Sequence, residues 1–417
     1  MTQKIKTMIS SKVVGNGLWM YLLQFFNAII PLITLPYVTR ILGTSQYGIF
    51  STSFNLVGYL QVVVDYGFSM SATREVALMG RNTNKISRLF SAVFYSKAIL
   101  LLSCFLFSIC YLNIWNPSDI QQLSYWMLIL TLIGVFFQVD WLFQGLQDMK
   151  YISIANIVAR TITTILIFVG VRNYHDILLY CFLYSLSPII SNFIGIIIVK
   201  FKYKLKLCKV TLNEIGKEFK TGWYIFTTQL TSKVFGSIGI TFLTFLATKS
   251  TVGIFSAIQK IPNVLILLWL PISQVLYPIV SKKMDNSFIE GKNFVLKVRR
   301  YMIIFFLTCT LILSIFSKII VKVAFGSAYS NEFLWLIPLL FWVLFSIDNN
   351  FWGIQILLGS GHDKQYSFCF QISVIVTIVL NLIFIYLWGG LGASLAPLVS
   401  EIILDILLIK AVNKIKV

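Results

Sequence analysis

Apolar stretches of about 20 residues follow one another along the whole chain, and short polar or basic segments separate them. An α-helix needs a stretch of that length to cross the hydrocarbon core of a bilayer. The weak alternation of apolar and polar residues that marks an outer-membrane barrel does not occur. The pattern therefore predicts an all-α integral membrane protein with twelve transmembrane helices. The predicted spans are residues 14–38, 47–66, 89–112, 122–142, 152–170, 177–199, 221–247, 253–279, 301–323, 333–357, 367–387 and 391–410.

Composition and charge agree with this class of protein. Hydrophobic residues make up 58% of the 417 residues, against about 45–50% in a typical soluble protein. The net charge of +19 raises the question of nucleic-acid binding. However, 25 of the 34 Lys and Arg residues lie in the two tails and in the loops after even-numbered spans, and only five lie on the opposite side. Because Lys/Arg-rich loops stay in the cytosol, we expect both termini to be cytosolic and no nucleic-acid partner.

Residues 222–256 repeat residues 17–51 at an offset of 205 positions without a gap. Nine of the 35 positions are identical, including the run GIFS at 48–51 and 253–256. A chance match between apolar helices is the alternative, but internal symmetry of this kind is typical of transporters. We interpret the chain as two pseudo-symmetric six-helix lobes in a parallel repeat, at residues 1–200 and 221–417. A basic cytosolic linker at 201–220 joins the lobes.

The linker carries seven lysines when Lys200 is included, and lysines alternate with apolar residues at 202–207. This alternation suggests a segment that lies on an anionic cytosolic leaflet. The alternative is the ordinary excess of positive charge in a cytosolic loop.

Four basic residues lie inside predicted spans: Lys97, Arg160, Lys233 and Lys260. A charge at that depth is costly, so we expect it to face a bundle interior or a watery cavity and to mark a functional site. The alternative is a side chain that snorkels to the interface or pairs with a carboxylate.

Acidic residues within or at the ends of spans include Asp65, Asp140, Asp348, Glu401 and Asp405. A buried carboxylate pairs with a cation or takes up a proton. We therefore consider Glu401, Asp348, Asp405 and Asp65 as candidates for coupling transport to an ion gradient. Structural pairing is the alternative, and Asp65 and Asp140 also fit simple helix-boundary positions.

No enzyme motif occurs: the chain lacks GxSxG, HExxH and a P-loop. The six cysteines are scattered without a CxxC, and the two histidines fall in loops on opposite sides of the membrane. We therefore expect no catalytic residue, metal site, disulfide framework or cofactor.

The run NGLWMYLLQFFNAIIPLITLPYVTRILGTSQYGIF, followed by DYGFSMSATREVA, resembles the opening of Wzx-type polysaccharide flippases. These proteins belong to the multidrug/oligosaccharidyl-lipid/polysaccharide exporter superfamily. The motif match covers about the first 80 residues, and the second half carries no equally clear signature. The matching residues are Pro31, Pro36, Tyr37, Arg40, Leu42, Gly43, Tyr47, Gly48, Asp65, Gly67 and Arg74.

The resemblance implies an O-antigen-type flippase of the bacterial inner membrane. Such a protein moves a polyprenyl-diphosphate-linked oligosaccharide from the cytosolic to the periplasmic leaflet by alternating access, commonly with ion coupling. Its partners are the lipid-linked oligosaccharide and membrane lipids, and a polysaccharide polymerase and a chain-length regulator are further candidates. A diphosphate calls for cations, and the glycan for polar and aromatic walls. The substrate-binding candidates are Arg160, Lys233, Lys260, Gln24, Asn27, Gln229, Arg40 and Lys97.

Two other functions fit a polytopic membrane protein. A drug/cation antiporter of the same superfamily would need an acidic cavity, whereas the deep charges in spans five, seven and eight are basic. A membrane polymerase or ligase of lipid-linked glycans usually carries a sizeable external loop with catalytic residues, and every predicted external loop here is short. The sequence therefore favours the flippase.

Overall fold

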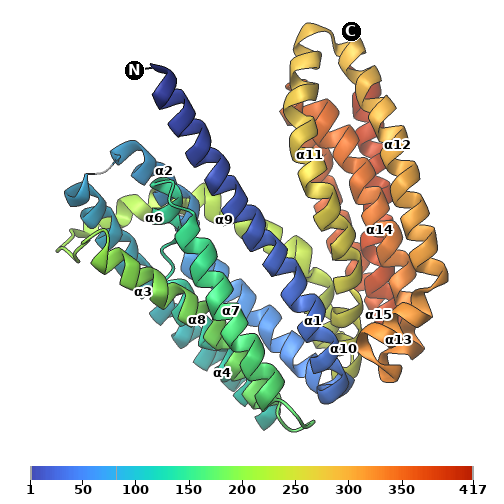
Figure 1. The fold of residues 1–417 in the computed structure, drawn as a ribbon. Helices are drawn as coiled ribbons and strands as arrows, with labels where there is room; N and C mark the ends of the chain where they lie inside the picture. The colour runs from blue at the N-terminus through green and yellow to red at the C-terminus, as the bar shows by residue number, and fades with distance from the viewer. Residues whose placement is uncertain (1, 81, 416–417) are drawn as a thin grey trace. The chain divides into compact units, whose positions relative to one another are not determined.

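The computed structural model describes residues 2–80 and 82–415, with side chains from Gly15 onward, and in these residues it is built from helices and short connections (Figure 1). In chain order the helices are α1 (Thr2–Asp65), α2 (Phe68–Met79), α3 (Thr83–Trp115), α4 (Asp119–Ile129), α5 (Thr131–Phe136), α6 (Asp140–Gly145), α7 (Lys150–Gly170), α8 (Ile177–Phe201), α9 (Leu212–Leu246), α10 (Lys249–Ile258), α11 (Lys260–Asn286), α12 (Phe288–Ile315), α13 (Ser317–Phe325), η1 (Ser327–Trp335), α14 (Leu336–Asn349), η2 (Asn350–Leu358) and α15 (Asp363–Asn413).

Nine helical stretches in the described residues are long and apolar enough to cross a membrane. Two of them contain two predicted spans each, because α1 and α15 continue through the expected turns. The helix bends at Gly43 (φ 69°) and at Gly389 (φ 55°), each between two predicted spans. Only glycine adopts this left-handed backbone without strain. The all-α membrane fold is confirmed, whereas the exact number of twelve spans stays a prediction.

The chain forms two compact units. The first contains the chain up to Leu42 together with Ser53–Val234, and the second contains Gly43–Thr52 together with the chain from Phe235 onward. Both α1 and α9 therefore contribute residues to both units.

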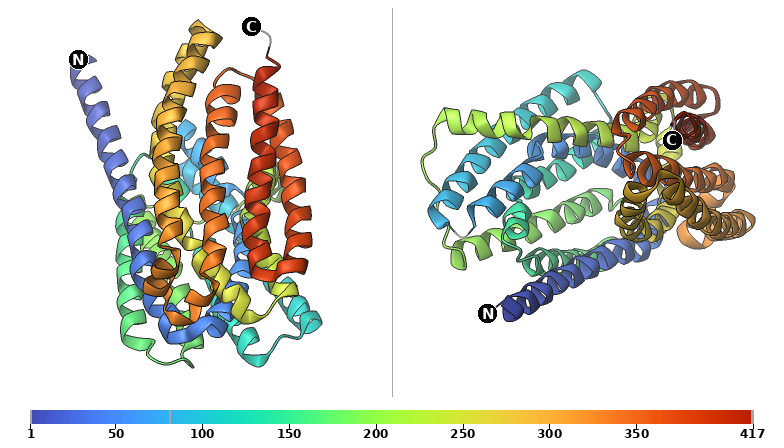
Figure 2. Two further views of the ribbon diagram at one scale, coloured as in Figure 1. Left: turned by 90° about the vertical axis from the view of Figure 1, so that its right-hand side faces the viewer. Right: turned by 90° about the horizontal axis from the view of Figure 1, so that it is seen from above.

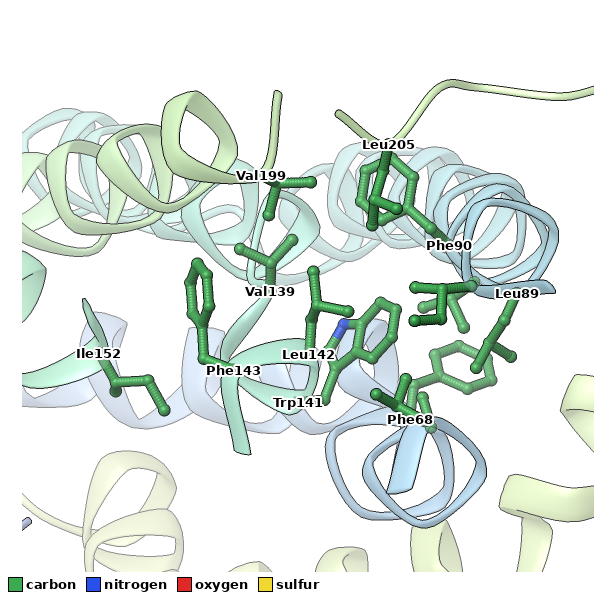
Figure 3. Packing of buried hydrophobic residues seen from close by; sticks show 14 of the residues in the cluster. Phe68, Leu89, Phe90, Val139, Trp141, Leu142, Phe143, Ile152, Val199 and Leu205 are labelled. Atoms are coloured by element: carbon green, nitrogen blue, oxygen red, sulfur yellow. The ribbon is translucent and has the colours of Figure 1, made fainter. Parts of the chain in front are cut away.

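The first unit has a core of aromatic and aliphatic side chains from α2, α3, α6 and the segment after α8. Figure 3 shows Trp141 and Leu142 of α6 close to Phe68 of α2 and Phe90 of α3, with Leu205 beside Phe90. The longest helices of this unit, such as α7 and α8, pack side by side (Figure 1). Because lipid is as apolar as a protein core, such packing is stabilised by close van der Waals fit more than by exclusion of water.

The second unit is a bundle in which α11, α12, α14 and α15 pack against one another (Figure 2). Exposed Leu, Ile, Val, Phe, Tyr or Trp side chains lie on α11, α12 and α15, whereas no residue of α14 is exposed. The interior of the bundle, in contrast, includes polar residues such as Asp348, Asn349, Gln355 and Glu401. This distribution is expected of a membrane bundle, in which polar groups face inward.

The two repeated GIFS segments meet within the second unit. An added Cβ on Gly48 would lie 1.7 Å from the carbonyl oxygen of Lys249, and one on Gly253 would lie 2.0 Å from that of Thr44. Thr44 and Lys249 are themselves equivalent in the 205-residue repeat, so the contact is reciprocal. A hydrogen bond of 2.8 Å between the Ser250 and Thr44 hydroxyls lies at the same crossing. Glycine is required here because the helix backbones touch.

We expect Gly48→Ala to destabilise the protein by on the order of 1–3 kcal/mol, because the methyl group forces the two helices apart. Gly236→Ala is the matched control, since an added Cβ there meets nothing within 4 Å. The control gains helix propensity and is expected to be neutral or slightly stabilised. The apparent melting temperature of each purified variant in detergent measures the difference. Equal melting temperatures for the two variants would contradict the packing argument.

Candidate functional site

The predicted site residues divide between the two units. The second unit holds Lys260, Asp348, Glu401 and Asp405. The first unit holds Gln24, Asn27, Arg40, Asp65, Lys97, Arg160, Gln229 and Lys233.

Lys233 lies half-buried on α9 against the part of α1 that belongs to the first unit. Its Nζ atom is 5.5 Å from the centroid of the Tyr59 ring, a cation–π geometry. The same nitrogen would be only 2.7 Å from a Cβ on Gly58, so this glycine leaves room for the lysine head group. Gln229, one turn earlier on α9, is also half-buried. A cation and an amide thus lie on neighbouring turns of one helix.

Other polar candidates of the first unit lie on α1 and α7. Arg160 is half-buried on α7 and interacts electrostatically with Tyr184 of α8. Asn27 has a buried side-chain oxygen without a hydrogen-bond partner in the described part of the chain. Gln24 and Arg40 are exposed on α1. An unsatisfied amide oxygen and exposed polar groups leave hydrogen-bonding capacity for a ligand.

Lys97 is held differently, because its charge is compensated inside the unit. Its side chain is only 1% exposed, and its Nζ lies 3.5 Å from Asp65 and donates a hydrogen bond of 3.1 Å to the Val135 carbonyl. The second carboxylate oxygen of Asp65 accepts a 2.8 Å hydrogen bond from Ser69. Asp140 adds further negative charge nearby. This arrangement matches the pairing alternative for Lys97 and ties α1 to α3.

In the second unit, Asp348 at the end of α14 forms a two-pronged ion pair with the Arg299 guanidinium of α12. Parallel N–H to carboxylate bonds are the strongest geometry for this pair. The guanidinium also lies 4.9 Å from the centroid of the Trp352 ring, so it is enclosed by a carboxylate and an aromatic face.

The two asparagines after Asp348 each reach another helix. Asn349 donates its amide to the carboxylate of Glu401 at 2.5 Å and to the Glu401 carbonyl at 2.9 Å, both on α15. Asn350 accepts a 2.8 Å hydrogen bond from Ser273 of α11. Three consecutive residues therefore connect α14 with α12, α15 and α11.

Asp405, one turn after Glu401, completes an acidic group. It interacts electrostatically with Asp348, Glu401 and Arg299. Three of the four predicted ion-coupling residues thus gather in one place, while Asp65 lies in the other unit. The Arg299 guanidinium interacts with Asp348 and Asp405, whereas Glu401 is hydrogen-bonded to Asn349, so acidic groups outnumber this guanidinium in the cluster. In the described residues no set of His, Cys, Asp or Glu side chains is arranged to hold a metal ion.

Sequence reasoning missed Arg299, which was counted among the loop charges between spans eight and nine. The structure instead places it within α12, which begins at Phe288, well before the predicted span. The run Asp348–Asn350 in an apolar span was the available signal that a partner exists. The π-helix η2 follows directly, and such helices frequently mark functional sites. Lys260, in contrast, is the exposed first residue of α11.

Comparisons with known proteins add the family. Residues 13–284 match the model of a family described as "Polysaccharide biosynthesis protein". The chain is 26% identical over 404 residues to the "Putative O-antigen transporter" of Escherichia coli (strain K12), covering 96% of this chain and 97% of that protein. It is 27% identical over 409 residues to the protein of the same name from Shigella dysenteriae, covering 95% and 99%.

Solved structures share the fold. The "Lipid II flippase MurJ, inward closed conformation" has a TM-score of 0.74 at 16% identity, covering 95% of this chain and 87% of that chain. An inward-facing multidrug resistance transporter of the MATE family and the MOP superfamily has a TM-score of 0.67 at 12% identity, covering 93% and 96%. The architecture is therefore that of a multi-pass membrane transporter.

We expect Asp348→Asn and Arg299→Gln each to destabilise the protein by on the order of 3 kcal/mol, because each leaves the partner's charge uncompensated. Arg88→Gln is the control, since the Arg88–Glu214 pair is exposed (3.4 Å) and such pairs contribute less than about 1 kcal/mol. The apparent melting temperatures and the coupling energy from the double mutant measure the effect. A loss no larger than that of the control would show that the pair contributes little.

Proposed function

Because the chain belongs to the polysaccharide biosynthesis protein family, we propose that it is a flippase for a polyprenyl-diphosphate-linked oligosaccharide. The substrate is an O-antigen or related repeat unit, and it moves from the cytosolic to the periplasmic leaflet of a bacterial inner membrane. Two relatives named as O-antigen transporters, which align over nearly their whole length, support this proposal. The transport fold shared with a lipid II flippase supports it as well.

The observation that carries the proposal is the charge of the polar residues inside the first unit. Lys233 of α9 and Arg160 of α7 are half-buried cations in the apolar surroundings of the first unit. A diphosphate entering a low-dielectric site needs such cations, because attraction between opposite charges is strong there. Arg160 can clamp phosphate oxygens with two N–H groups, and Lys233 provides a point charge.

The remaining candidates provide the walls of the substrate site. Gln24, Asn27 and Gln229 offer amides to sugar hydroxyls. Arg40, just before the bend of α1 at Gly43, and Lys260, the first residue of α11, are exposed cations. Lys97 has the weakest case for direct substrate contact, because Asp65 and the Val135 carbonyl already bind its ammonium group.

Ion coupling belongs to the second unit in this proposal. Asp348 binds the Arg299 guanidinium, and Asp405 interacts with Asp348, Arg299 and Glu401, so a proton or a small cation would relieve the excess of acidic groups. Because Asp348 and Glu401 connect α14 with α12 and α15, a change in their charge can alter helix packing and bias the alternating-access equilibrium.

The membrane topology follows from the basic loops. We propose cytosolic termini and a cytosolic position for the segment between α8 and α9 and for the adjoining ends of α11 and α12, which are rich in lysine. The polymerase and the chain-length regulator that act on the flipped repeat units are proposed partners.

The decisive experiment follows the lipid-linked repeat unit in cells that lack this protein. We expect single repeat units to accumulate on the cytosolic leaflet and surface polymer to be lost. Units that reach the outer leaflet but remain unpolymerised would indicate a polymerase instead. Unchanged polymer together with greater sensitivity to cationic drugs would indicate a drug antiporter.

In the same cells, Lys233→Ala and Arg160→Ala are expected to restore surface polymer at least tenfold less well than the wild type. That factor corresponds to the loss of one charge-assisted interaction of about 1.5–3 kcal/mol. The matched controls are Lys322→Ala and Arg172→Ala, which remove exposed cations from loops on the predicted external side. Membrane levels of each variant are measured in parallel. Normal polymer with either test variant would remove that residue from the site.

Glu401→Gln tests the coupling. Glutamine keeps the shape but neither ionises nor releases a proton, so we expect transport to lose its dependence on the applied ion gradient. Glu290→Gln is the control, because Glu290 is exposed in the first turn of α12, where its carboxylate lies 3.9 Å from the Lys283 ammonium group of α11. Transport into sealed vesicles, measured with and without a gradient, gives the result. A gradient dependence equal to that of the wild type would exclude Glu401 as the coupling residue.

A further inference from the structure

We call the segment between α8 and α9, residues 202–211, the basic linker. Residues 204–211 are not helical, yet the structure holds them against the first unit at several points. At its start, the Tyr203 hydroxyl donates to Asp148 at 2.5 Å, and Lys202 donates to the Tyr151 hydroxyl at 2.6 Å. At its end, the backbone N–H of Thr211 donates a hydrogen bond of 2.7 Å to the Glu214 carboxylate in the first turn of α9. Both ends of the basic linker are therefore fixed.

The middle of the basic linker is bound along α3. The backbone N–H of Lys206 donates to the Ser87 hydroxyl at 3.4 Å, and that of Cys208 donates to the Ser91 hydroxyl at 2.8 Å. Two residues of extended chain span about 6.6 Å, and four residues of helix rise about 6 Å. The two spacings match, so alternate N–H groups meet serines on successive turns.

The Leu205 side chain anchors the basic linker to the core of the first unit. Leu205 is only 8% exposed and belongs to the core of the first unit beside Phe90 (Figure 3). Lys204 and Lys206 stand directly before and after Leu205 in the chain. Both lysines are exposed, and so is Lys209.

These three lysines present uncompensated charge. Within the described part of the chain, no carboxylate lies within ion-pair distance of Lys204, Lys206 or Lys209. The nearby Glu214 is already paired with Arg88 at 3.4 Å, and Asp148 lies 3.8 Å from Lys202. The basic linker therefore holds a fixed row of cations.

Exposed apolar side chains lie in and beside this row. Phe201 is 72% exposed, Leu207 is 53% exposed and Leu212 is 82% exposed. An aqueous loop gains nothing from presenting such groups, whereas the boundary between head groups and acyl chains accepts both cations and apolar side chains. The basic linker begins where the membrane-length helix α8 ends, which is at that boundary.

We propose that the basic linker is a binding surface for the head groups of anionic phospholipids. The lysines bind the phosphates, and Leu207 and the flanking Phe201 and Leu212 enter the upper acyl region. The assignment to an anionic leaflet rests on the proposed topology, since the cytosolic leaflet carries the negative surface potential. Because α3 and α9 are both attached to the basic linker, bound lipid would fix their ends at the membrane surface.

The test titrates the purified full-length protein in neutral detergent with phosphatidylglycerol or phosphatidylcholine and follows its melting temperature. The triple variant Lys204→Gln, Lys206→Gln, Lys209→Gln is compared with Lys282→Gln, Lys292→Gln, Lys297→Gln, which removes the same charge from the adjoining ends of α11 and α12. With about fivefold in affinity per lysine, we expect the half-saturating phosphatidylglycerol fraction to rise at least tenfold for the linker variant. The control is expected to change it less than twofold.

Several outcomes would overturn the proposal. Equal shifts in both triple variants would indicate net charge alone, and no shift in either would exclude the basic linker. Competition by millimolar glycerol phosphate would indicate a site for soluble anions. Replacing the three lysines with arginine keeps the charge and must keep lipid binding, which separates binding from misfolding. Because no transport is measured, failure here leaves the flippase proposal untouched.

Discussion

Compensation of charge inside an apolar medium is the constraint on which this structure depends. Each unit contains an ion pair that lies largely inside the unit and joins two helices: Lys97 with Asp65 in the first unit, and Arg299 with Asp348 in the second. Such a pair rarely adds net stability compared with an apolar contact. It does impose a geometry, because moving either helix alone would leave a charge unpaired in hydrocarbon. The ion pairs therefore fix which helices belong together.

Close backbone approach is the second constraint, and it acts where charge is absent. Gly48 and Gly253 occupy equivalent positions of the repeat. Gly48 approaches the backbone of Lys249, and Gly253 approaches the backbone of Thr44, the residue equivalent to Lys249. Without water to drive helices together, van der Waals contact at small residues and short hydroxyl bonds such as Thr44–Ser250 stabilise the crossing. The identical GIFS runs are thus explained by packing, independently of any role in transport.

The division of polar residues suggests how structure and transport are related. Some polar side chains, such as Lys97 and Asn349, form ion pairs or hydrogen bonds that join neighbouring helices. The half-buried cations Lys233 and Arg160 lie beside aromatic side chains, Tyr59 for Lys233 and Tyr184 for Arg160.

The sequence by itself determined the all-α membrane fold and the family, because apolar length and the motif at the start of the chain are properties of the linear sequence. It also indicated Asp348, Glu401 and Asp405, since acidic residues in apolar spans are rare. Only the tertiary structure decided their partners. The sequence pattern places Arg299 in a loop, whereas α12 begins at Phe288 and contains it. The pattern also leaves the partner of Lys97 open, and the structure places Asp65 beside it. The physical reason is that depth can be read from distance along a helix, whereas pairing depends on which faces meet, and residues such as Asp65 and Lys97 come together only through packing.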